Sequence, residues 1–184
     1  MPIVVFLLLL LAQGQVAAEP LGKRIFGLEE SVALEQLGLT VAAKLDTGAD
    51  SSSLDARAIR QFSEAGQDWV SFDIADGEGW RTVTLPLADQ VRIRRRSESL
   101  QSGQRGYSRR PVVTLDLCLG DRQVPARVNL TDRSNFQYPL LLGVDVLREL
   151  AVLVDPSASQ TAGLPRCPAI AGEVFIDNHY SEAP

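Results

Sequence analysis

The sequence predicts an all-β protein, built as a barrel or a sandwich of short strands. Segments rich in Val, Ile, Leu and Thr recur along the chain, and apolar and polar residues alternate within them. Turns that are polar or contain glycine, such as residues 75–79 and 120–121, separate these segments. Helical periodicity is weak and occurs in two places. Many short strands with frequent turn signals are typical of all-β architectures.

Nine segments are expected to form strands because they combine a Val-, Ile-, Leu- or Thr-rich composition with alternation. In residues 112–119, for example, three leucines alternate with Asp116 and Cys118, which is the pattern of a strand with one buried face. In chain order, the expected strands are Arg24–Leu28, Ser31–Glu35, Thr40–Asp46, Trp69–Ile74, Arg81–Leu87, Val91–Arg95, Val112–Leu119, Gln123–Leu130 and Leu140–Leu142.

Two short helices are expected between and after these strands. The apolar face of the first is formed by Leu54, Ala58, Ile59 and Phe62. This helix would end at Gly66. The second covers residues 144–150 after Gly143, and Asp145 in its first turn would interact favourably with the helix dipole.

The length of 184 residues fits one domain behind a targeting segment. Residues 1–18 contain an apolar run followed by small residues, which resembles a secretory signal peptide cleaved after Ala18. No Lys or Arg precedes the run, and an uncleaved anchor at a membrane is the alternative. The domain is expected to span residues 19–156. Residues 157–184, rich in Pro, Ser, Ala and Gly, are expected to form a loosely packed tail.

Cleavage of the signal segment would make the protein periplasmic or secreted. In such an oxidising compartment, Cys118 and Cys167 permit one disulfide, although Cys118 also fits a buried, small hydrophobic position. Both interpretations stay open at the level of sequence. A net charge of −5 argues against nucleic acid as a partner.

Residues 92–110 carry seven arginines and a single acid, Glu98. The middle of this segment is polar and contains glycine, which indicates an exposed hairpin tip. A solvated basic loop is the simpler interpretation, because most charge runs are solvated surface. A flap that recognises an anionic ligand is the functional one.

An apolar strand that ends in Leu45 runs directly into Asp46, Thr47 and Gly48. A strand that meets a turn explains these residue types. They also suit peptide hydrolysis by carboxylates, in which an ionised and a protonated acid share one water. In that chemistry Asp46 reacts, Thr47 supplies a hydroxyl that locks the loop, and Gly48 permits a tight turn with a close amide.

Residues 43–54, "AKLDTGADSSSL", resemble the active-site segment of retropepsin-like aspartic proteases. Residues 138–150, "YPLLLGVDVLREL", resemble that fold's second signature, an apolar strand, a glycine and a short helix. With residues 109–135, these segments are similar to the bacterial retropepsin-like family usually labelled ATP-dependent zinc protease. The resemblance covers residues 22–156. Val144 stands where the family often has Arg, so the ion pair of that Arg is not expected here.

The resemblance implies a closed retropepsin-like β-barrel with a flap hairpin and one short C-terminal helix. It implies that Asp46, Thr47 and Gly48 are catalytic and that residues 92–110 form the flap. The implied substrate-binding residues are Ala49, Asp50, Arg94, Arg95, Arg96, Arg109 and Arg110. Relatives are associated with ATP-grasp ligases that add glutamate-like residues to proteins, which fits an acidic peptide as substrate.

Neither ATP nor zinc is expected despite the family label. The sequence has no G-x-x-x-x-G-K-[ST] loop for phosphates and no H-E-x-x-H motif, and its single histidine is His179. We therefore expect no cofactor and no metal.

One D-T-G motif supplies one carboxylate, so the resemblance implies a symmetric homodimer in which each chain contributes Asp46. Three other acids of the chain compete for the second position. Asp50 is too close in sequence to face Asp46, and Asp145 fits the start of a helix. Asp132 and Arg133 are expected to form a local ion pair or an Asx turn beneath the site, and catalysis by Asp132 stays open as the alternative.

The sequence thus predicts an aspartic endopeptidase for acidic or glutamate-rich peptides. The alternative is a non-catalytic module of the same fold that binds an anionic peptide or envelope polymer through its arginines. A small barrel that carries an apolar ligand is disfavoured by the aromatic content of 6% and by an acid at a strand end.

Overall fold

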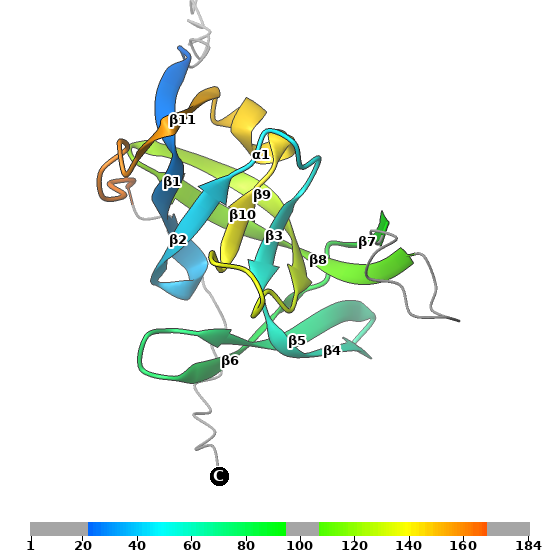
Figure 1. The fold of residues 1–184 in the computed structure, drawn as a ribbon. Coiled ribbons are helices and arrows are strands. Elements are labelled where there is room, and N and C mark those ends of the chain that lie inside the picture. Colours follow the sequence, from blue (N-terminus) through cyan, green and yellow to red (C-terminus); the bar gives the residue numbers. More distant parts are fainter. Residues whose placement is uncertain (1–21, 95–106, 169–184) are drawn as a thin grey trace, which may run out of the picture.

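The structure, a computed structural model, describes residues 22–94 and 107–168 (Figure 1). Strands dominate it, as the sequence predicts. In chain order the elements are β1 (Arg24–Leu34), the 3-10 turn η1 (Glu35–Leu37), β2 (Leu39–Leu45), β3 (Ser52–Asp55), β4 (Arg57–Glu64), β5 (Gln67–Ala75), β6 (Trp80–Pro86), β7 (Asp89–Arg94), β8 (Tyr107–Leu119), β9 (Arg122–Thr131), β10 (Leu140–Leu142), α1 (Val144–Glu149) and β11 (Val152–Ser159).

Within the described residues, eight strands form one sheet in the order β11-β1-β2-β10-β3-β9-β8-β7. A further pairing between β1 and β8 closes this sheet into a barrel. The long strand β1 pairs with β11, β2 and β8 and covers both segments expected at the N-terminus. The predicted closed β-barrel with one short helix near its C-terminal end is therefore confirmed.

The barrel core consists of the apolar residues that alternate along these strands. Leu115, Leu117 and Leu119 of β8 are fully buried, as their alternation predicts. Leu140 and Leu142 of β10 and several residues of β2 and β9 complete this cluster. Helix α1 covers one end of the barrel and contributes the buried Val146 and Leu147 (Figure 1).

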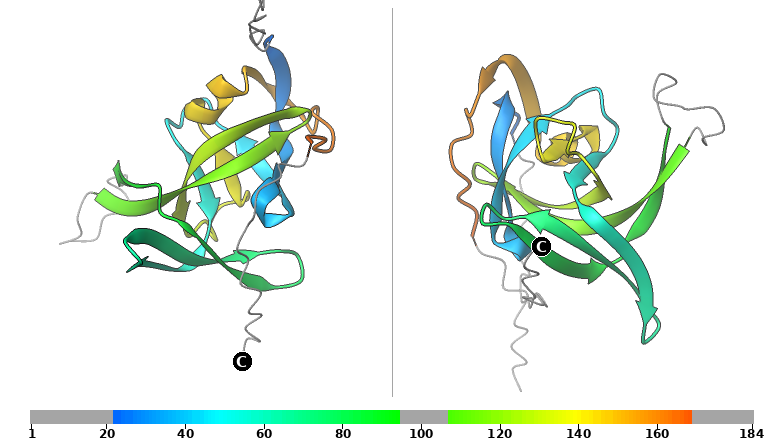
Figure 2. Two further views of the ribbon diagram at one scale, coloured as in Figure 1. Left: turned by 180° about the vertical axis from the view of Figure 1, so that it is seen from behind. Right: turned by 60° about the horizontal axis from the view of Figure 1, so that its bottom comes forward.

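The second sheet, β4-β5-β6, is antiparallel and lies at the opposite end of the barrel from α1 (Figures 1 and 2). Its strands β5 and β6 bury one alternating face, which includes Val70, Phe72 and Val83. The hairpin of β7 and β8 projects beside this sheet. Its tip, residues 95–106, lies outside the described residues.

The helix expected between Leu54 and Phe62 is wrong. This segment forms the end of β3 and most of β4. The backbone amide of Ala56 donates to the carbonyl of Thr131, which fixes the chain beside β9, and Ala58 has a φ of 47° that no right-handed helix can contain. Gly66 lies in the turn between β4 and β5 rather than at a helix end.

The C-terminal segment is also packed more firmly than expected. Strand β11 passes the predicted domain boundary at residue 156 and pairs in parallel with β1. Residues 160–162 then bond to the Glu29 carbonyl and the Glu30 carboxylate of β1. Residues 159–162 therefore belong to the packed domain, because Ser159 pairs with Glu29 and the backbone amides of residues 160–162 are bonded to β1.

Cys118 and Cys167 form a disulfide with a Cα–Cα distance of 5.9 Å. The bond joins buried β8 to the segment after β11, across 49 residues of sequence. Closing a loop of that length in the unfolded chain stabilises the fold by about 4 kcal/mol in the chain-entropy model. Neither residue is the free hydrophobic cysteine that the sequence also allowed.

No helix in residues 22–94 and 107–168 is long and apolar enough to cross a membrane.

Candidate active site

Asp46 lies on a tight loop where β2 leaves the barrel sheet. Its backbone amide donates to the carbonyl of Leu142 at 2.8 Å, so the chain remains bonded to β10 up to this residue. The amide of Gly48 donates to the Asp46 carboxylate at 2.9 Å, and the amide of Ala49 donates to the Asp46 carbonyl at 3.3 Å. These bonds hold a half-buried carboxylate in a fixed position at the end of a buried strand.

Gly48 is required by this close contact. A Cβ at residue 48 would lie 3.3 Å from Oδ1 of Asp46, which is tighter than an ordinary contact. Thr47 and Gly48 are exposed, as is Asp50, whereas Ala49 is half-buried. The structure therefore places residues 46–50 on one tight loop at the end of β2.

A second set of contacts fixes the loop from behind. The amide of Val144 donates to the carbonyl of Ala49 at 2.8 Å, and the amide of Gly143 donates to Ser52 Oγ at 2.9 Å. Ser52 Oγ in turn donates to the Asp145 carboxylate at 2.9 Å. A Cβ on Gly143 would lie 2.7–2.8 Å from backbone atoms of Ala49 and Ser51, so only glycine fits there. The start of α1 thus fastens the loop that carries Asp46.

Asp46 shares one face of the sheet with three other side chains. Leu141 pairs with Lys44 on one side and with Ser53 on the other, and paired residues direct their side chains to the same face. Asp46 follows Lys44 by two residues and therefore points to that face as well. We call this the Asp46 face, formed by Lys44, Asp46, Ser53 and Leu141. Its members are half-buried apart from Ser53, which is buried.

Arg133 lies against the Asp46 face and is only 6% exposed. Its Nη1 donates to Ser53 Oγ at 2.8 Å, its Nε donates to the carbonyl of Tyr138 at 3.1 Å, and the ring of Phe136 lies 4.8 Å from its Cζ. Burial lowers the pKa of the Arg133 guanidinium, and the positive charge of Arg110 lowers it further. The negative charges of Asp55 and Asp46 raise this pKa and so oppose the effect of burial. These three charges are therefore close enough to affect Arg133.

The rival acids of the chain have other partners. Asp145 accepts hydrogen bonds from the amide and hydroxyl of Ser52 and from the amide of Val146. Asp132 is exposed and accepts from the amide of Ser134 at 2.8 Å, which confirms the predicted Asx turn. Hydrogen bonds from the Ser134 side chain and backbone lower the pKa of this Asp132 carboxyl. Neither acid is positioned as a partner for Asp46 within one chain.

The arginines of the β7–β8 hairpin are only partly described. Arg109 is exposed and pairs across the hairpin with Arg92, whose guanidinium lies 5.3 Å from the ring of Tyr107. Arg110 is half-buried, and its Nη1 donates to Asn129 Oδ1 at 3.0 Å. Arg94 ends β7, and Arg95 and Arg96 lie outside the described residues. The structure thus brings Arg110, but not Arg109, next to the residues behind the Asp46 loop.

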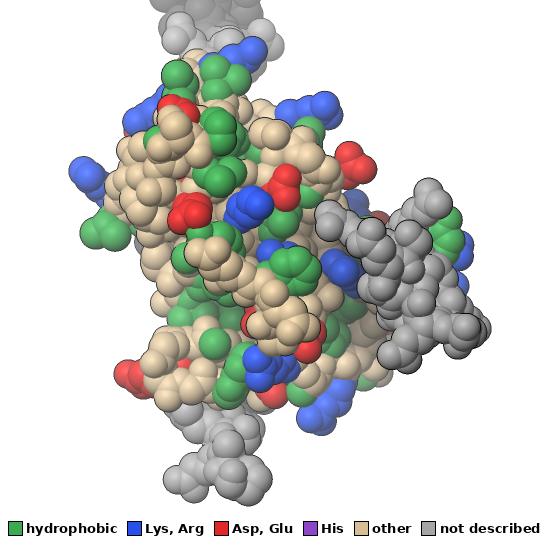
Figure 3. All heavy atoms as spheres, viewed as in Figure 1, with side chains coloured by type: hydrophobic (Ala, Val, Ile, Leu, Met, Phe, Trp, Pro, Cys, Tyr) green, Lys and Arg blue, Asp and Glu red, His purple; other side chains and the backbone are tan. Residues whose placement is uncertain are grey.

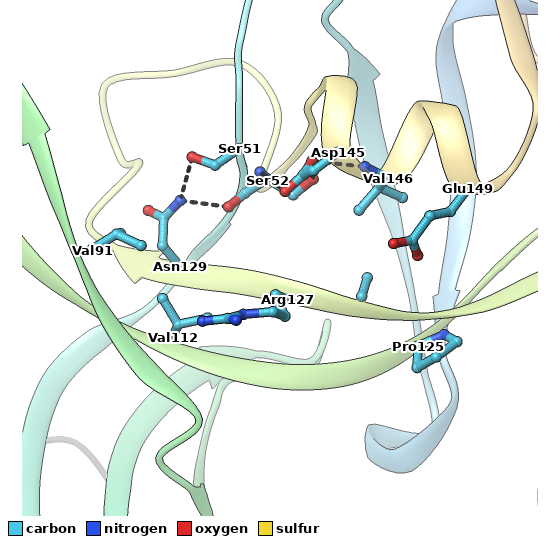
Figure 4. Close-up of a pocket in the computed structure, with 11 residues that line it drawn as sticks. Ser51, Ser52, Val91, Val112, Pro125, Arg127, Asn129, Asp145, Val146 and Glu149 are labelled. Carbon is cyan, nitrogen blue, oxygen red and sulfur yellow. Dashed lines mark hydrogen bonds between the residues drawn. The ribbon is translucent and has the colours of Figure 1, made fainter.

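A cavity of about 310 Å³ opens behind this loop (Figure 4). Ser51 and Ser52 line one wall, where Asn129 of β9 donates to the Ser52 carbonyl at 2.5 Å. Val146 and Glu149 of α1 project into it from the opposite side. The remaining lining residues are Val91, Val112, Pro125, Ala126, Arg127 and Asp145. The cavity therefore adjoins the Asp46 loop without including Asp46.

In the described residues, no group of three or more His, Cys, Asp or Glu side chains is placed to hold a metal ion.

Known proteins share this fold and these segments. Residues 25–164 match the model of the RimB-like family, described as retropepsin-like aspartic endopeptidase RimB. The chain belongs to the RimB-like family. This places it among retropepsin-like aspartic endopeptidases and confirms the resemblance that residues 43–54 and 138–150 indicated.

Two kinds of relative illustrate the family. Proteins of Shewanella halifaxensis and Shewanella pealeana, each named "Probable alpha-L-glutamate ligase", are 33% identical over 142 residues, which is 77% of this chain. The chain spans only 30% of the length of these curated relatives. A crystal structure of a Legionella pneumophila protein of unknown function is 34% identical, has a TM-score of 0.62, and is matched over 75% of this chain and 97% of its own.

Sequence reasoning missed two parts of this site. Ser52 was only one serine in a run of three, and nothing in the run shows that its hydroxyl joins Gly143 to Asp145. Arg133 was expected to pair with its neighbour Asp132, but its side chain instead binds Ser53, 80 residues earlier. Its position next to a family motif was the single available signal.

Proposed function

We propose that this member of the RimB-like family is an aspartic endopeptidase whose catalytic dyad consists of Asp46 from two copies of the chain. The observation that carries this proposal is the Asp46 loop itself. A half-buried carboxylate is held at a strand end by the Gly48 amide, on a loop fastened to α1. The fixed geometry suits a group that must act on a bound water.

The homodimer follows from the need for a second carboxylate. Asp145 and Asp132 are occupied by local hydrogen bonds, and Asp50 is exposed on the same short loop. A symmetric dimer would bring two Asp46 loops together on its axis. Thr47, exposed at the tip of the loop, would then bond across to the partner loop.

In this dimer the two carboxylates share one proton, because two like charges at about 3 Å do not both ionise. The ionised acid takes a proton from the water as it attacks the peptide carbonyl. The protonated acid polarises that carbonyl and stabilises the developing negative charge on its oxygen. The C–N bond then breaks as the acid that took the proton from water gives it to the leaving amine, so the reaction requires only this chain's residues, the substrate and water.

Acidic or glutamate-rich peptides are the proposed substrates. Arg92 and Arg109 lie directly opposite each other in the hairpin, a like-charge pair that costs stability unless an anion lies near. Arg110 and the hairpin arginines 94–96 are proposed to contact the same substrate. The curated relatives carry the name of a glutamate ligase, and their glutamate chemistry is compatible with such a peptide.

We further propose that the protein works in the periplasm or after secretion. The signal-like residues 1–18 and the disulfide between Cys118 and Cys167 support an oxidising compartment.

A non-catalytic module that binds an anionic peptide or polymer is the second candidate for the function of the protein. The paired Arg92 and Arg109 would suit anion binding by a module as well as by a peptidase. A binding module, however, does not require a carboxylate fixed as that of Asp46 is.

The decisive experiment compares the wild-type protein with Asp46→Asn on a mixed peptide library between about pH 4 and pH 7. We expect cleavage by the wild type, insensitive to a chelator, and a loss on the order of 1,000-fold or more in the variant. Asp68→Asn, at an exposed position near the start of β5, is the matched control and should retain full activity.

Sedimentation of the wild type with and without peptide tests the dimer in the same preparation. Cleavage that survives Asp46→Asn would make Asp46 structural and would refute the mechanism. Cleavage by a protein that stays monomeric with peptide bound would refute the shared dyad.

A further inference from the structure

Arg133 is a nearly buried cation whose guanidinium contacts no carboxylate in the described residues. With 6% exposure it is among the few buried charged residues of the domain. Buried arginines are normally paired with carboxylates, because removing an unpaired charge from water is costly. In the described residues, no carboxylate oxygen lies within 4 Å of its guanidinium, and its hydrogen bonds go to a hydroxyl and a carbonyl. Asp55 accepts a hydrogen bond from the backbone amide of Arg133 and acts on its charge, but in the described residues no carboxylate contacts the guanidinium itself.

The guanidinium is close to the reacting group. Ser53, which binds Nη1, and Asp46 lie on opposite sides of β10 and on the same face of the sheet. Ser53 lies two strand spacings from Lys44, and Asp46 follows Lys44 by two residues, so Ser53 and Asp46 are about 12 Å apart. The charge of Asp46 acts on Arg133 at this separation. A peptide bound over Asp46 would therefore place a neighbouring side chain next to Arg133.

The contacts of Arg133 hold its guanidinium without using all of it. Nε and Nη1 each donate one hydrogen bond, and the exposed ring of Phe136 lies 4.8 Å from Cζ. Among the described residues Nη2 makes no hydrogen bond, so its two N–H groups remain available to a ligand. A planar donor group with a free edge fits a carboxylate, which can accept two parallel hydrogen bonds.

A second cation strengthens this preference. Arg110 is close enough to act on the charge of Arg133, and its Nη1 is held by Asn129. The positive charge of Arg110 disfavours a further cation at Arg133 and favours an anion there. Lys44 contributes a third positive charge to the Asp46 face. Figure 3 shows that basic and acidic side chains are otherwise intermixed on the visible face of the molecule.

We propose that Arg133 is a specificity-determining residue that binds the carboxylate of a glutamate or aspartate side chain of the substrate, beside the scissile bond. The proposal rests on the proposed function for the position of the peptide and deepens it, because it assigns acid recognition to a fixed residue of the barrel in addition to the hairpin arginines. Ser53, Tyr138 and Phe136 would position the guanidinium before substrate arrives.

The test measures binding, so that it does not depend on catalysis. Two fluorescein-labelled peptides serve as probes, one of alternating Ala and Glu and one with each Glu replaced by Gln. Their dissociation constants are measured by anisotropy with the full protein carrying Asp46→Asn, and again with Arg133→Gln, Arg133→Lys or Arg148→Gln added. Arg148 is an exposed arginine of α1, so its variant controls for the loss of one positive charge.

We expect Arg133→Gln to weaken binding of the Glu probe by about tenfold or more and to change the Gln probe by less than about twofold. Arg133→Lys should retain part of the preference, because it keeps the charge and loses the planar fork. Arg148→Gln should leave both constants unchanged. An equal effect of Arg133→Gln on the two probes, or no effect, would overturn the proposal.

A second variant answers the objection that Arg133→Gln misfolds. Ser53→Asp keeps Arg133 and places a carboxylate against Nη1, where it would occupy the anion position from within the chain. It should abolish the preference for the Glu probe while the thermal unfolding midpoint stays at or above that of the parent. An intact preference in a folded Ser53→Asp protein would contradict the proposal. Failure of the proposed function would appear differently, as cleavage that is absent or insensitive to Asp46→Asn.

Discussion

Glu30 and Asp46 are two acids of the same barrel, placed on adjacent strands, with opposite surroundings. Glu30 is fully buried, and its carboxylate accepts hydrogen bonds from the amides of Gly27, Thr161 and Ala162 and from the Thr161 hydroxyl, at 2.6–3.1 Å. Asp46 is half-buried, and among the described residues only the Gly48 amide donates to its carboxylate.

The number of hydrogen bonds to each carboxylate separates Glu30, which stabilises the fold, from Asp46, which retains unused acceptor positions. Both carboxylate oxygens of Glu30 accept hydrogen bonds, and the donors come from both ends of the domain, β1 and residues 161–162. Asp46 keeps acceptor capacity for a water or a second carboxylate. A carboxylate with unused acceptors in a rigid frame costs stability, and that cost is typical of functional sites.

The largest effect expected from this comparison is on stability. Glu30→Gln replaces one acceptor oxygen by an NH2 group that faces amide donors, so it should destabilise the fold by roughly 3 kcal/mol or more. Asp46→Asn should cost less than about 1 kcal/mol, because it disturbs a single bond at a half-exposed site. Urea unfolding of the two variants measures both values. Equal destabilisation would remove the distinction between the two acids.

A smaller effect is expected behind the Asp46 loop. Ser52→Ala removes the buried hydroxyl that joins Gly143 to Asp145, which should cost about 1–3 kcal/mol. Because the same hydroxyl fastens the Asp46 loop to α1, kcat should fall as well. Ser63→Ala, at an exposed hydroxyl of β4, is the control and should change neither quantity measurably. A full kcat in Ser52→Ala would show that the loop is held by its backbone bonds alone.

The smallest effect concerns an exposed acid, Asp89. The Gln90 amide and, second, the side chain of Arg127 lower the pKa of its carboxyl. The pKa of the Asp89 carboxyl is thus lower in the folded than in the unfolded protein. Its ionised form therefore stabilises the fold above the unfolded pKa, and this stabilisation is lost as the pH falls through the folded pKa. Arg127→Gln should raise the Asp89 pKa only part of the way, because the Gln90 bond remains. An NMR titration measures this shift, and Arg148→Gln should produce none.

Much of the barrel could be predicted from the sequence, because half-buried strands carry an alternating pattern. The pattern located β1 (as two segments), β2, β5 to β10 and helix α1, although β8 begins earlier than expected, and it missed β3, β4 and β11. The error at β4 has a physical cause. Its residues are mostly exposed, so burial imposes no alternation, and the spacing of Leu54, Ala58 and Phe62 imitates a helix.

The other omissions concern contacts between distant parts of the chain. Strand β11 contains Pro156, which is tolerated because β11 lies at the edge of its sheet, but in a sequence it indicates a loop. The four donors to Glu30 include groups 131 and 132 residues away, and no local pattern encodes such a bond. The Asp46 loop was predictable because its chemistry is contained in consecutive residues.

The disulfide also imposes an order on biosynthesis. Cys118 leaves the ribosome 49 residues before Cys167, and β9, β10, α1 and β11 are made between them. The bond can therefore close only after every strand of the barrel has been synthesised. Protein produced in a reducing host would lack this covalent link, and Glu30 would then carry more of the task of holding residues 161 and 162. Preparations meant for enzymology should therefore be expressed with export, or oxidised during refolding.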